Sequence, residues 1–314
     1  MAPRIVCVVG PTACGKTTLG VLLAKRFNGE VVSADSMQIY RGMTVGTAAP
    51  TAAEMDGVPH HMIAVADPAE PWSAARYARE AIPVVDEILA RGKLPILVGG
   101  TGLWLDAVVR GRDFAPGAAG GEIRQKLRER LERQGIGPLL EELRRVDPEA
   151  AQRLHPADEK RILRALEVYE ETGETISAHN ARTAALPPRY DAVWIGLRFE
   201  DRADMWALID RRVDAMAQAG LLEEVRALVR AGVPRDATAL QAIGYKELLD
   251  VGEQGEGLEA ALEEVKLRSR QYAKRQLTWL RRNGDIQWIT WGKERDFARA
   301  LQVSTEILAA AGVS

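Results

Sequence analysis

The sequence is poor in the side chains that cross-link a chain or bind transition metals. Its 314 residues include only two cysteines and four histidines. Cys7 and Cys14 are too close in the chain to form a useful cross-link, so we expect two free thiols, as in a reducing cytoplasm. The same scarcity excludes a structural zinc cluster.

Long apolar runs and a large excess of one charge are also missing. No run is long enough to span a membrane, and the start "MAPR" is not that of a signal peptide, so we expect a cytoplasmic protein without a membrane partner. A monomer is our default expectation. The net charge of −2 predicts no general attraction to nucleic acid, so RNA binding would need a local basic patch. The 46% hydrophobic and 27% charged residues indicate a globular protein with one large domain, or a core with a smaller insertion.

A phosphate-binding loop follows the first apolar run. The stretch "GPTACGKTT" at residues 10–18 fits the P-loop pattern, with Gly10 and Gly15 as its glycines, and it leads into a helical pattern. Backbone N–H groups of such a loop surround phosphate oxygens, Lys16 neutralises charge, and the Thr17 hydroxyl can ligate Mg²⁺. Because a strand-like run precedes the loop and a helix follows it, we expect a bound phosphate or diphosphate rather than an unliganded Gly-rich turn.

Short β-rich runs alternate with helical patterns along most of the chain. This alternation predicts an α/β fold with a parallel sheet covered by helices. Helices are expected to begin near Lys16, Ser73 and Gly102. Strands are expected at residues 4–10, 29–35, 93–100, 191–199 and 286–291. Since ligands of such folds bind at the carboxyl ends of the strands, the residues after the first three should meet in one cleft.

The pattern changes between residues 112 and 188, where the runs are charged and helical and no strand is indicated. Helices are expected within residues 121–135, 138–154 and 158–173. We therefore predict an all-helical insertion, bounded by "RDFAPGAAGG" and "LPPRY", in a P-loop core made of residues 1–111 and 189–314.

Two polar residues follow predicted strands. Asp35, in "VVSADSMQIYRG", is placed to accept a proton from a nucleophile, although an N-cap role explains it equally well from spacing alone. The acid, amide and aromatic of "DSMQIYRG" favour the reading of a planar substrate. Thr101, in "LVGGTGLW", can donate to a phosphate oxygen between glycines that let the backbone approach a ligand, but a helix cap is the simpler interpretation.

Other candidates are ambiguous. His60 and His61 are adjacent, so on an extended segment they point to opposite faces and do not chelate together; we expect one packed and one solvated. In the helical stretch "WALIDRRVDAM", Arg211 or Arg212 could neutralise a leaving diphosphate, or both could be surface charges.

A basic helix is predicted near the C-terminus. The stretch "KLRSRQYAKRQLTWLRR", residues 266–282, contains seven basic residues and no acidic one. A helical period places Arg268, Tyr272, Arg275, Trp279 and Arg282 on one face, and an apolar stripe of Leu262, Ala273, Leu277 and Leu280 on another. Basic side chains interleaved with aromatics suit a polyanion with stackable bases, whereas the simpler interpretation is a solvated face.

A second acid, which would hold Mg²⁺ for phosphoryl transfer, is not found at another strand end, and no N-K-x-D segment indicates a GTPase. Three functions remain open from the residues alone. Two are enzymes: a phosphate-handling enzyme with an RNA partner, or an ATP-dependent small-molecule kinase of the nucleoside type. The third is a non-catalytic RNA-binding protein with a vestigial P-loop. That function predicts that residues needed for catalysis have been replaced, but such residues are intact here, among them Lys16 and Asp35.

Eight stretches together resemble the tRNA dimethylallyltransferase (isopentenyltransferase) family, in the family's order and over most of the chain. They are "GPTACGKT", "GEVVSADSMQIYRGMTVGTAAP", "VPHHMI", "PILVGGTGLW", "LHPADEKRILRALEVYEETG", "RRVDAMAQAGLLEEV", "QAIGYKELL" and "YAKRQLTWLRR". The resemblance implies a P-loop α/β core with a helical insertion that grips tRNA. It also implies transfer of the dimethylallyl group of dimethylallyl diphosphate to N6 of the adenosine immediately 3′ of the anticodon.

The resemblance assigns roles to single residues. Asp35 matches the general base that takes the N6 proton, and Thr101 matches the hydroxyl near the bridging oxygen of the diphosphate. Lys16 and Arg212 match the cations that stabilise the leaving diphosphate, with Mg²⁺ assisting through Thr17. The diphosphate is expected to contact Gly10, Pro11, Thr12, Ala13, Cys14, Gly15, Lys16 and Thr17.

The anticodon stem-loop is expected to contact two segments that the resemblance indicates and the basic helix that the residues themselves indicate. The segments are "DSMQ", made of Asp35, Ser36, Met37 and Gln38, and "EKRIL", made of Glu159, Lys160, Arg161, Ile162 and Leu163. Thr101 and the helix residues Arg268, Tyr272 and Arg275 complete the expected tRNA contacts.

Overall fold

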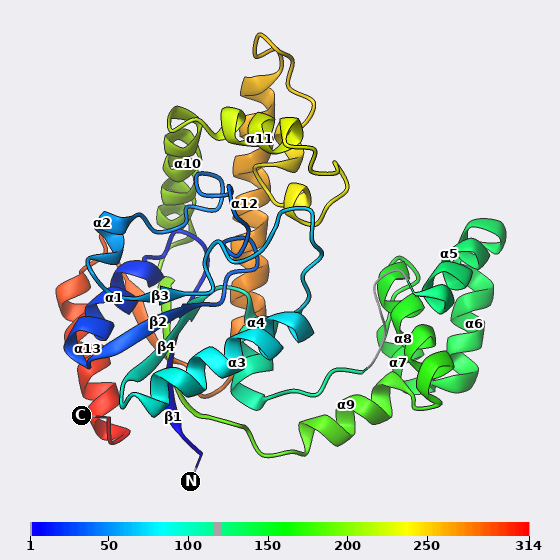
Figure 1. Cartoon of the computed structure of the whole chain (residues 1–314), viewed down its shortest axis with the longest axis horizontal. Coiled ribbons are helices and arrows are strands. Elements are labelled where there is room, and N and C mark those ends of the chain that lie inside the picture. Colours follow the sequence, from blue (N-terminus) through cyan, green and yellow to red (C-terminus); the bar gives the residue numbers. More distant parts are fainter. Residues whose placement is uncertain (1, 116–120, 314) are drawn as a thin grey trace. The chain divides into compact units, whose positions relative to one another are not determined.

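The computed structural model describes residues 2–115 and 121–313 (Figure 1). The chain divides into two compact units: unit 1, Met1–Gly111 with Pro188–Ser314, and unit 2, Arg112–Pro187. The second boundary lies one residue before the position expected from the sequence. Residues 116–120, in the expected linker "RDFAPGAAGG", lie outside the described residues.

Unit 1 contains one sheet of six parallel strands. The order across the sheet is β3-β2-β4-β1-β5-β6. Their bounds are β1 Arg4–Val9, β2 Gly29–Ser33, β3 His60–His61, β4 Leu94–Gly99, β5 Asp191–Phe199 and β6 Gln287–Trp291. The five predicted strands and their parallel arrangement are confirmed. The short edge strand β3 was missed because two histidines carry no β-rich pattern.

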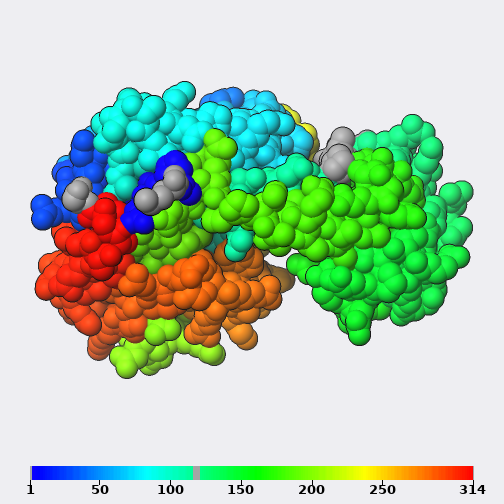
Figure 2. Space-filling view, turned by 90° about the horizontal axis from the view of Figure 1, so that it is seen from below, coloured from blue at the N-terminus to red at the C-terminus, as the bar shows by residue number. Residues whose placement is uncertain are grey.

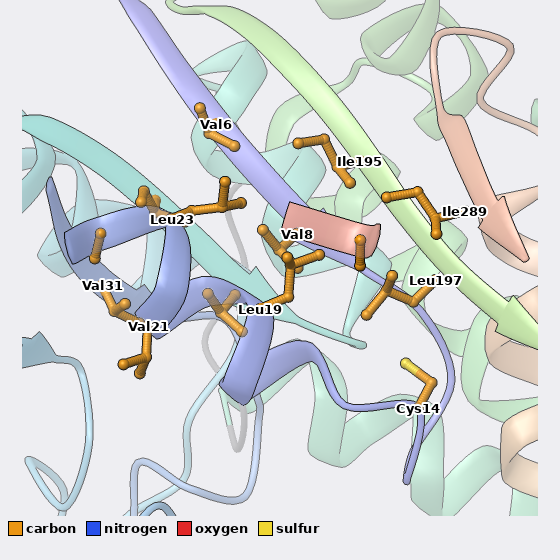
Figure 3. Packing of buried hydrophobic residues seen from close by; sticks show 14 of the residues in the cluster. Val6, Val8, Cys14, Leu19, Val21, Leu23, Val31, Ile195, Leu197 and Ile289 are labelled. Carbon is orange, nitrogen blue, oxygen red and sulfur yellow. The ribbon is translucent and has the colours of Figure 1, made fainter. Parts of the chain in front are cut away.

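Helices cover both faces of the sheet, which explains why β1 is apolar at every position from Ile5 to Val9. Helices α1 (Lys16–Arg26) and α13 (Phe297–Ala310) cover one face. There Leu19 and Leu23 pack on Val6, Val8, Ile195 and Leu197, as Figure 3 shows. Helices α3 (Ala74–Ala90) and α4 (Gly102–Arg110) pack on the other face and on each other, where Tyr77 stacks on Trp104.

Among the described residues, six further helices and 3-10 turns belong to unit 1. They are α2 (Ala52–Met55), α10 (Arg202–Gln218), α11 (Leu221–Arg230), the 3-10 turns η1 (Ala239–Gln241) and η2 (Lys246–Leu248), and the long α12 (Leu258–Leu280), orange in Figure 1. Helix α12 contacts α10, η2 and α4. The predicted basic helix is therefore confirmed, but it ends at Leu280, so Arg281 and Arg282 lie past its end. In Figure 2 the residues of α13 (red) lie beside the N-terminal residues (blue), where a Cβ on Gly312 would be 3.5 Å from Arg4.

Unit 2 has its own core. Its helices are α5 (Glu122–Gln134), α6 (Ile136–Val146), α7 (Pro148–Arg153), α8 (Glu159–Thr172) and α9 (Ile176–Ala184). Leucines of α5, α6 and α8 form the core, among them Leu127, Leu139 and Leu166, each fully buried. The run 138–154 is broken at Asp147, whose side chain caps α7 by accepting from Ala150 N, while Pro148 has no N–H to continue α6.

Within the described part of the chain, no helix combines the length and the apolar character that crossing a bilayer requires.

Candidate active site

Two adjoining cavities open at the carboxyl ends of β1, β2 and β4, where the sequence predicted a single cleft. The P-loop cavity, about 240 Å³, is lined by loop residues together with Val98, Gly99 and Glu54. The second cavity, about 310 Å³, is lined by residues of α10, α12 and the segment between η1 and η2. Four residues line both: Thr12, Asp35, Arg212 and Tyr272. These shared residues form the wall where reactants held in the two cavities would meet.

The P-loop needs its two glycines for space and for backbone conformation. Gly10 has φ +154° and Gly15 has φ +90°. A Cβ on Gly10 would lie 2.6 Å from Leu197 O, and one on Gly15 would lie 2.6 Å from the Phe297 ring. Helix α1 then begins at Lys16 with no acidic residue in its first turn and no side-chain cap, so its N–H groups remain available to an anion.

Not every loop residue faces the cavity. Thr12, Ala13, Gly15, Lys16 and Thr17 line it. Gly10, Pro11 and Cys14 do not; the Cys14 side chain is fully buried in the core beneath the loop (Figure 3). Burial raises the pKa of the Cys14 thiol, so it stays protonated and acts as an apolar group.

Lys16 and Arg212 bring cations to the P-loop. Lys16 Nζ donates to Pro11 O at 2.7 Å. Arg212 Nη1 donates to Thr12 Oγ1 at 2.6 Å, and its Nη2 donates to Thr47 O at 3.2 Å. Burial lowers the pKa of Arg212 and the Asp35 carboxylate acts against this, so the guanidinium remains charged. Arg211 is exposed, so Arg212 is the arginine of this pair at the site.

The Asp35 side chain is held by a backbone N–H two residues further along the chain, and Asp35 lines both cavities. Its Oδ1 accepts from Met37 N at 2.9 Å. Among the described residues, Oδ2 has no hydrogen-bond partner, so this oxygen is available to a proton donor in a cavity. Oδ1 thus stabilises the turn after β2, while Oδ2 of the same carboxylate is available for chemistry.

Thr101 stands at the N-cap position of α4, yet its side chain makes no cap hydrogen bond. Its Oγ1 instead accepts from Ser36 N at 3.3 Å and donates to Ser36 Oγ at 3.4 Å. The Thr101 side chain therefore connects the start of α4 to Ser36, the residue beside Asp35, and a helix-capping role does not explain it.

The neighbours of Asp35 line different cavities. Ser36 and Met37 line the second cavity. Gln38 lines the P-loop cavity, where its Nε2 donates to Thr47 O at 3.4 Å and to Ala48 O at 3.3 Å.

Gln276 of α12 is a site residue that the sequence reasoning missed. It is buried, its Oε1 accepts from Thr12 N at 2.9 Å, and its Nε2 donates to Gly100 O at 3.1 Å. A Cβ on Gly100 would lie 2.1 Å from that Nε2, and one on Gly102 would lie 1.9 Å from the Trp279 ring. These glycines therefore make room for side chains of α12, whereas the sequence suggested close approach of a ligand.

Tyr272 and Arg275 extend the site along α12. Burial and the charge of Asp35 raise the pKa of Tyr272 to about 12, while hydrogen bonds to Thr101 and Gln276 act in the opposite direction. The phenol is therefore protonated and can donate a hydrogen bond. The Arg275 guanidinium lies 5.7 Å from the Tyr272 ring centroid at the edge of the second cavity.

The expected basic face of α12 is only partly free. On that face Arg268 is paired with Glu264, and elsewhere in the stretch 266–282 Arg270 is paired with Asp210 and Lys266 with Asp214 and Glu263. Trp279 packs on Gly102. Within the stretch 266–282, the exposed cations with no ion pair to a described residue are Lys274, Arg275, Arg281 and Arg282. In the expected apolar stripe, Ala273 and Leu280 are buried and Leu262 and Leu277 are half-buried.

The two histidines do not enter either cavity. His60 Nδ1 lies 2.9 Å from Val58 O, and His61 Nε2 lies 2.7 Å from the buried Glu30 carboxylate. Both rings are half-buried, so the expectation of one packed and one solvated histidine is wrong.

The segment "EKRIL" forms the first turns of α8 in unit 2. Glu159, Lys160 and Arg161 are exposed. Ile162 and Leu163 are buried in the core of unit 2 at 0% and 3% exposure, so their side chains are not accessible to a ligand. Of the five residues expected to contact tRNA, only Glu159, Lys160 and Arg161 have side chains that a bound RNA could reach.

Comparison with known proteins gives concordant matches. The model of the IPP transferase family matches residues 38–283. A protein of Caldanaerobacter subterraneus subsp. tengcongensis described as tRNA dimethylallyltransferase is 47% identical over 290 residues, which cover 92% of each chain. The structure of the full-length tRNA isopentenylpyrophosphate transferase of Bacillus halodurans aligns with a TM-score of 0.73 and 41% identity, covering 99% of this chain and 96% of that one. A eukaryotic dimethylallyltransferase acting on tRNA aligns with a TM-score of 0.83 and 28% identity, covering 98% and 80%.

Proposed function

Since the chain belongs to the IPP transferase family, we propose that it transfers the dimethylallyl group of dimethylallyl diphosphate to N6 of the adenosine immediately 3′ of the anticodon in tRNA. Diphosphate is the other product. The observation that carries this proposal within the structure is the shared wall of the two cavities. A phosphate-binding loop opens on one side of Asp35, and a second cavity large enough for part of a nucleoside opens on the other.

Two residues of the wall, Asp35 and Arg212, take part in the proposed reaction, together with Lys16 of the P-loop cavity and Thr101, which lines neither cavity. The N6 lone pair attacks the first carbon of the prenyl chain, the bond from that carbon to the bridging oxygen breaks, and its electron pair stays on the diphosphate. Asp35 accepts the N6 proton through its free oxygen. Lys16 and Arg212 stabilise the charge on the departing diphosphate, and such stabilisation is commonly the largest catalytic contribution. Thr101 is assigned the position beside the bridging oxygen by the family resemblance.

Mg²⁺ fits the donors of the P-loop cavity. Within the described residues no three His, Cys, Asp or Glu side chains are grouped to hold a metal ion by themselves. Thr17 and Glu54 line the cavity and carry oxygen donors, and Mg²⁺ is usually bound by few protein oxygens together with substrate phosphates. When bound, the ion would neutralise diphosphate charge.

The tRNA is proposed to enter with its target base out of the stack, as for other enzymes that modify a base. Ser36, Met37 and Tyr272 would contact the base in the second cavity, with Arg275 at its edge. The anticodon stem-loop would bind the exposed cations of α12, and unit 2 would contribute through Lys160 and Arg161. We place the enzyme in the cytoplasm as a monomer; its two free, buried thiols suit a reducing compartment.

The function is tested by incubating the purified chain with unmodified tRNA, Mg²⁺ and dimethylallyl diphosphate labelled in the prenyl group. A parallel reaction contains ATP and a nucleoside mixture without the prenyl donor. We expect label in the tRNA without ATP. ATP consumption without prenyl transfer would instead support the small-molecule kinase, which the family matches do not favour.

Charge reversal on α12 should weaken tRNA binding. In a Lys274→Glu/Arg275→Glu variant we expect lower tRNA affinity and a shallower dependence of log Kd on log salt, by about 0.7–0.9 for each phosphate that the variant no longer neutralises. The measurement is a filter-binding titration at several salt concentrations. Arg299→Glu on α13 is the control, since that residue is also exposed but lies outside both cavities. An affinity and slope equal to those of the control would show that the α12 cations are merely solvated.

A further inference from the structure

Glu224 holds a loop of the active site in place. It lies in the first turn of α11, and its carboxylate faces residues 44–46. Oε2 accepts from Thr44 N at 2.8 Å, Thr44 Oγ1 at 2.9 Å and Val45 N at 2.8 Å. Oε1 accepts from Gly46 N at 2.9 Å and from Tyr245 Oη at 2.6 Å. Three successive backbone N–H groups thus bind one carboxylate, as loops of this kind bind anionic ligands.

The carboxylate is half-buried and ionised. Burial alone would raise the pKa of Glu224, but the hydrogen bonds from Gly46, Tyr245, Val45 and Thr44 outweigh it and hold that pKa below its ordinary value. The interaction is therefore present throughout the neutral range and is lost only as the pH falls through that lowered pKa.

The loop leads directly to the reacting groups. Thr47 O, one residue after the bound segment, accepts from Arg212 Nη2 and from Gln38 Nε2. Gly46 and Thr47 line the second cavity, and Ala48 lines the P-loop cavity. Residues 42–49 form no helix or strand, but a turn closed by hydrogen bonds from Ala48 N to Val45 O and from Ala49 N to Thr44 O, each 3.0 Å. These bonds set the shape of the turn, whereas the contacts of Glu224 fix where the turn and its Thr47 carbonyl lie relative to α11.

The packing around the loop leaves little alternative for its position. A Cβ on Gly46 would lie 2.5 Å from the Tyr245 ring and 2.7 Å from Leu221. Tyr245 itself is fully buried and donates to Glu224. The Tyr245 ring limits how closely the loop can approach α11, and the Glu224 carboxylate fixes the direction of the loop's N–H groups. The direction of the Thr47 carbonyl follows from that of the preceding N–H groups.

We propose that Glu224 is a positioning residue for the proposed prenyl transfer, which holds the Thr47 carbonyl so that Arg212 is oriented toward the leaving diphosphate. This role rests on the proposed function of Arg212. Glu224 touches no substrate in this scheme. It acts through the loop, so its effect should appear in the rate of transfer and should depend on the presence of Arg212.

The test is a double-mutant cycle of Glu224→Gln and Arg212→Ala, with the single-turnover rate, the tRNA Kd and the melting temperature measured for each variant. Glutamine keeps the volume but places an NH₂ donor opposite N–H or O–H donors. We expect the rate to fall roughly 10-fold or more, as for removal of a charged hydrogen-bond acceptor, with tRNA affinity nearly unchanged. In the Arg212→Ala background the same change should have little further effect, because coupled residues are not additive.

Controls separate this inference from the function on which it rests. Glu223→Gln, an exposed neighbour paired with Arg226, should leave the rate unchanged. If Glu224→Gln melts below the assay temperature, Tyr245→Phe removes one donor from the same carboxylate and enters the same cycle. Effects that add in full in the Arg212→Ala background, or an unaltered rate in the single variant, would overturn the positioning role. Absence of transfer by the unmodified chain would instead overturn the proposed function.

Discussion

Replacing Asp35 by alanine should lower the rate of prenyl transfer by about 10²–10⁴-fold, the usual contribution of a general base. The free Oδ2 on the wall between the cavities is the atom that the substitution removes. Binding of tRNA should be retained, because the exposed cations proposed to bind its phosphates lie on α12, whereas Asp35 lies in the segment after β2. The measurement pairs a single-turnover rate with a tRNA titration, so that loss of chemistry is distinguished from loss of binding.

A second substitution at the same position separates chemistry from local folding. Asp35→Asn keeps an oxygen that can accept from Met37 N, so the turn is preserved while the basic group is removed. We expect it to be nearly as slow as Asp35→Ala. Asp236→Asn, at an exposed acid outside both cavities, is the matched control. Transfer by Asp35→Asn at the rate of this control would remove Asp35 as the base.

The sheet could be predicted because its signals are local. A β-rich run marks a buried parallel strand, and the residues that follow it mark the strand's carboxyl end. A glycine loop follows β1, and a polar turn follows β2 after Ser33. The adjacency of β2, β4 and β1 then brings Asp35, Thr101 and the P-loop together. The strand β3 has no such signal in its own sequence. It forms because His60 and His61 pair with Val31 and Val32 of β2, which are distant in the sequence.

The site residues that sequence reasoning missed act across long chain separations. Gln276 is 264 residues from Thr12, and Glu224 is about 180 residues from the loop it binds. Nothing in the local pattern of "YAKRQLTWLRR" distinguishes a buried glutamine from a solvated one, because charge dominates the stretch. Ile162 shows the opposite error: a stretch taken as a whole from a resemblance included side chains that belong to the core of unit 2.

Replacing Arg212 by alanine should slow transfer by about 10²–10³-fold, the range found when a group that stabilises developing charge is removed. Its Nη1 and Nη2 donate to Thr12 Oγ1 and Thr47 O, which places the cation beside the P-loop and next to Asp35. Because the charge it stabilises is larger on the departing diphosphate than on the bound donor, kcat should fall more than KM for dimethylallyl diphosphate rises.

The chain provides a matched control for this variant in the preceding residue. Arg211→Ala removes the same side chain from the same turn of α10, but Arg211 is exposed and lines neither cavity. We expect this variant to transfer at the unmodified rate. Arg212→Lys should recover only part of the activity, since an ammonium group cannot contact Thr12 and Thr47 in the fixed geometry of a guanidinium. Equal rates for Arg211→Ala and Arg212→Ala would show that the leaving diphosphate is stabilised without Arg212, by Lys16 and the N–H groups at the start of α1.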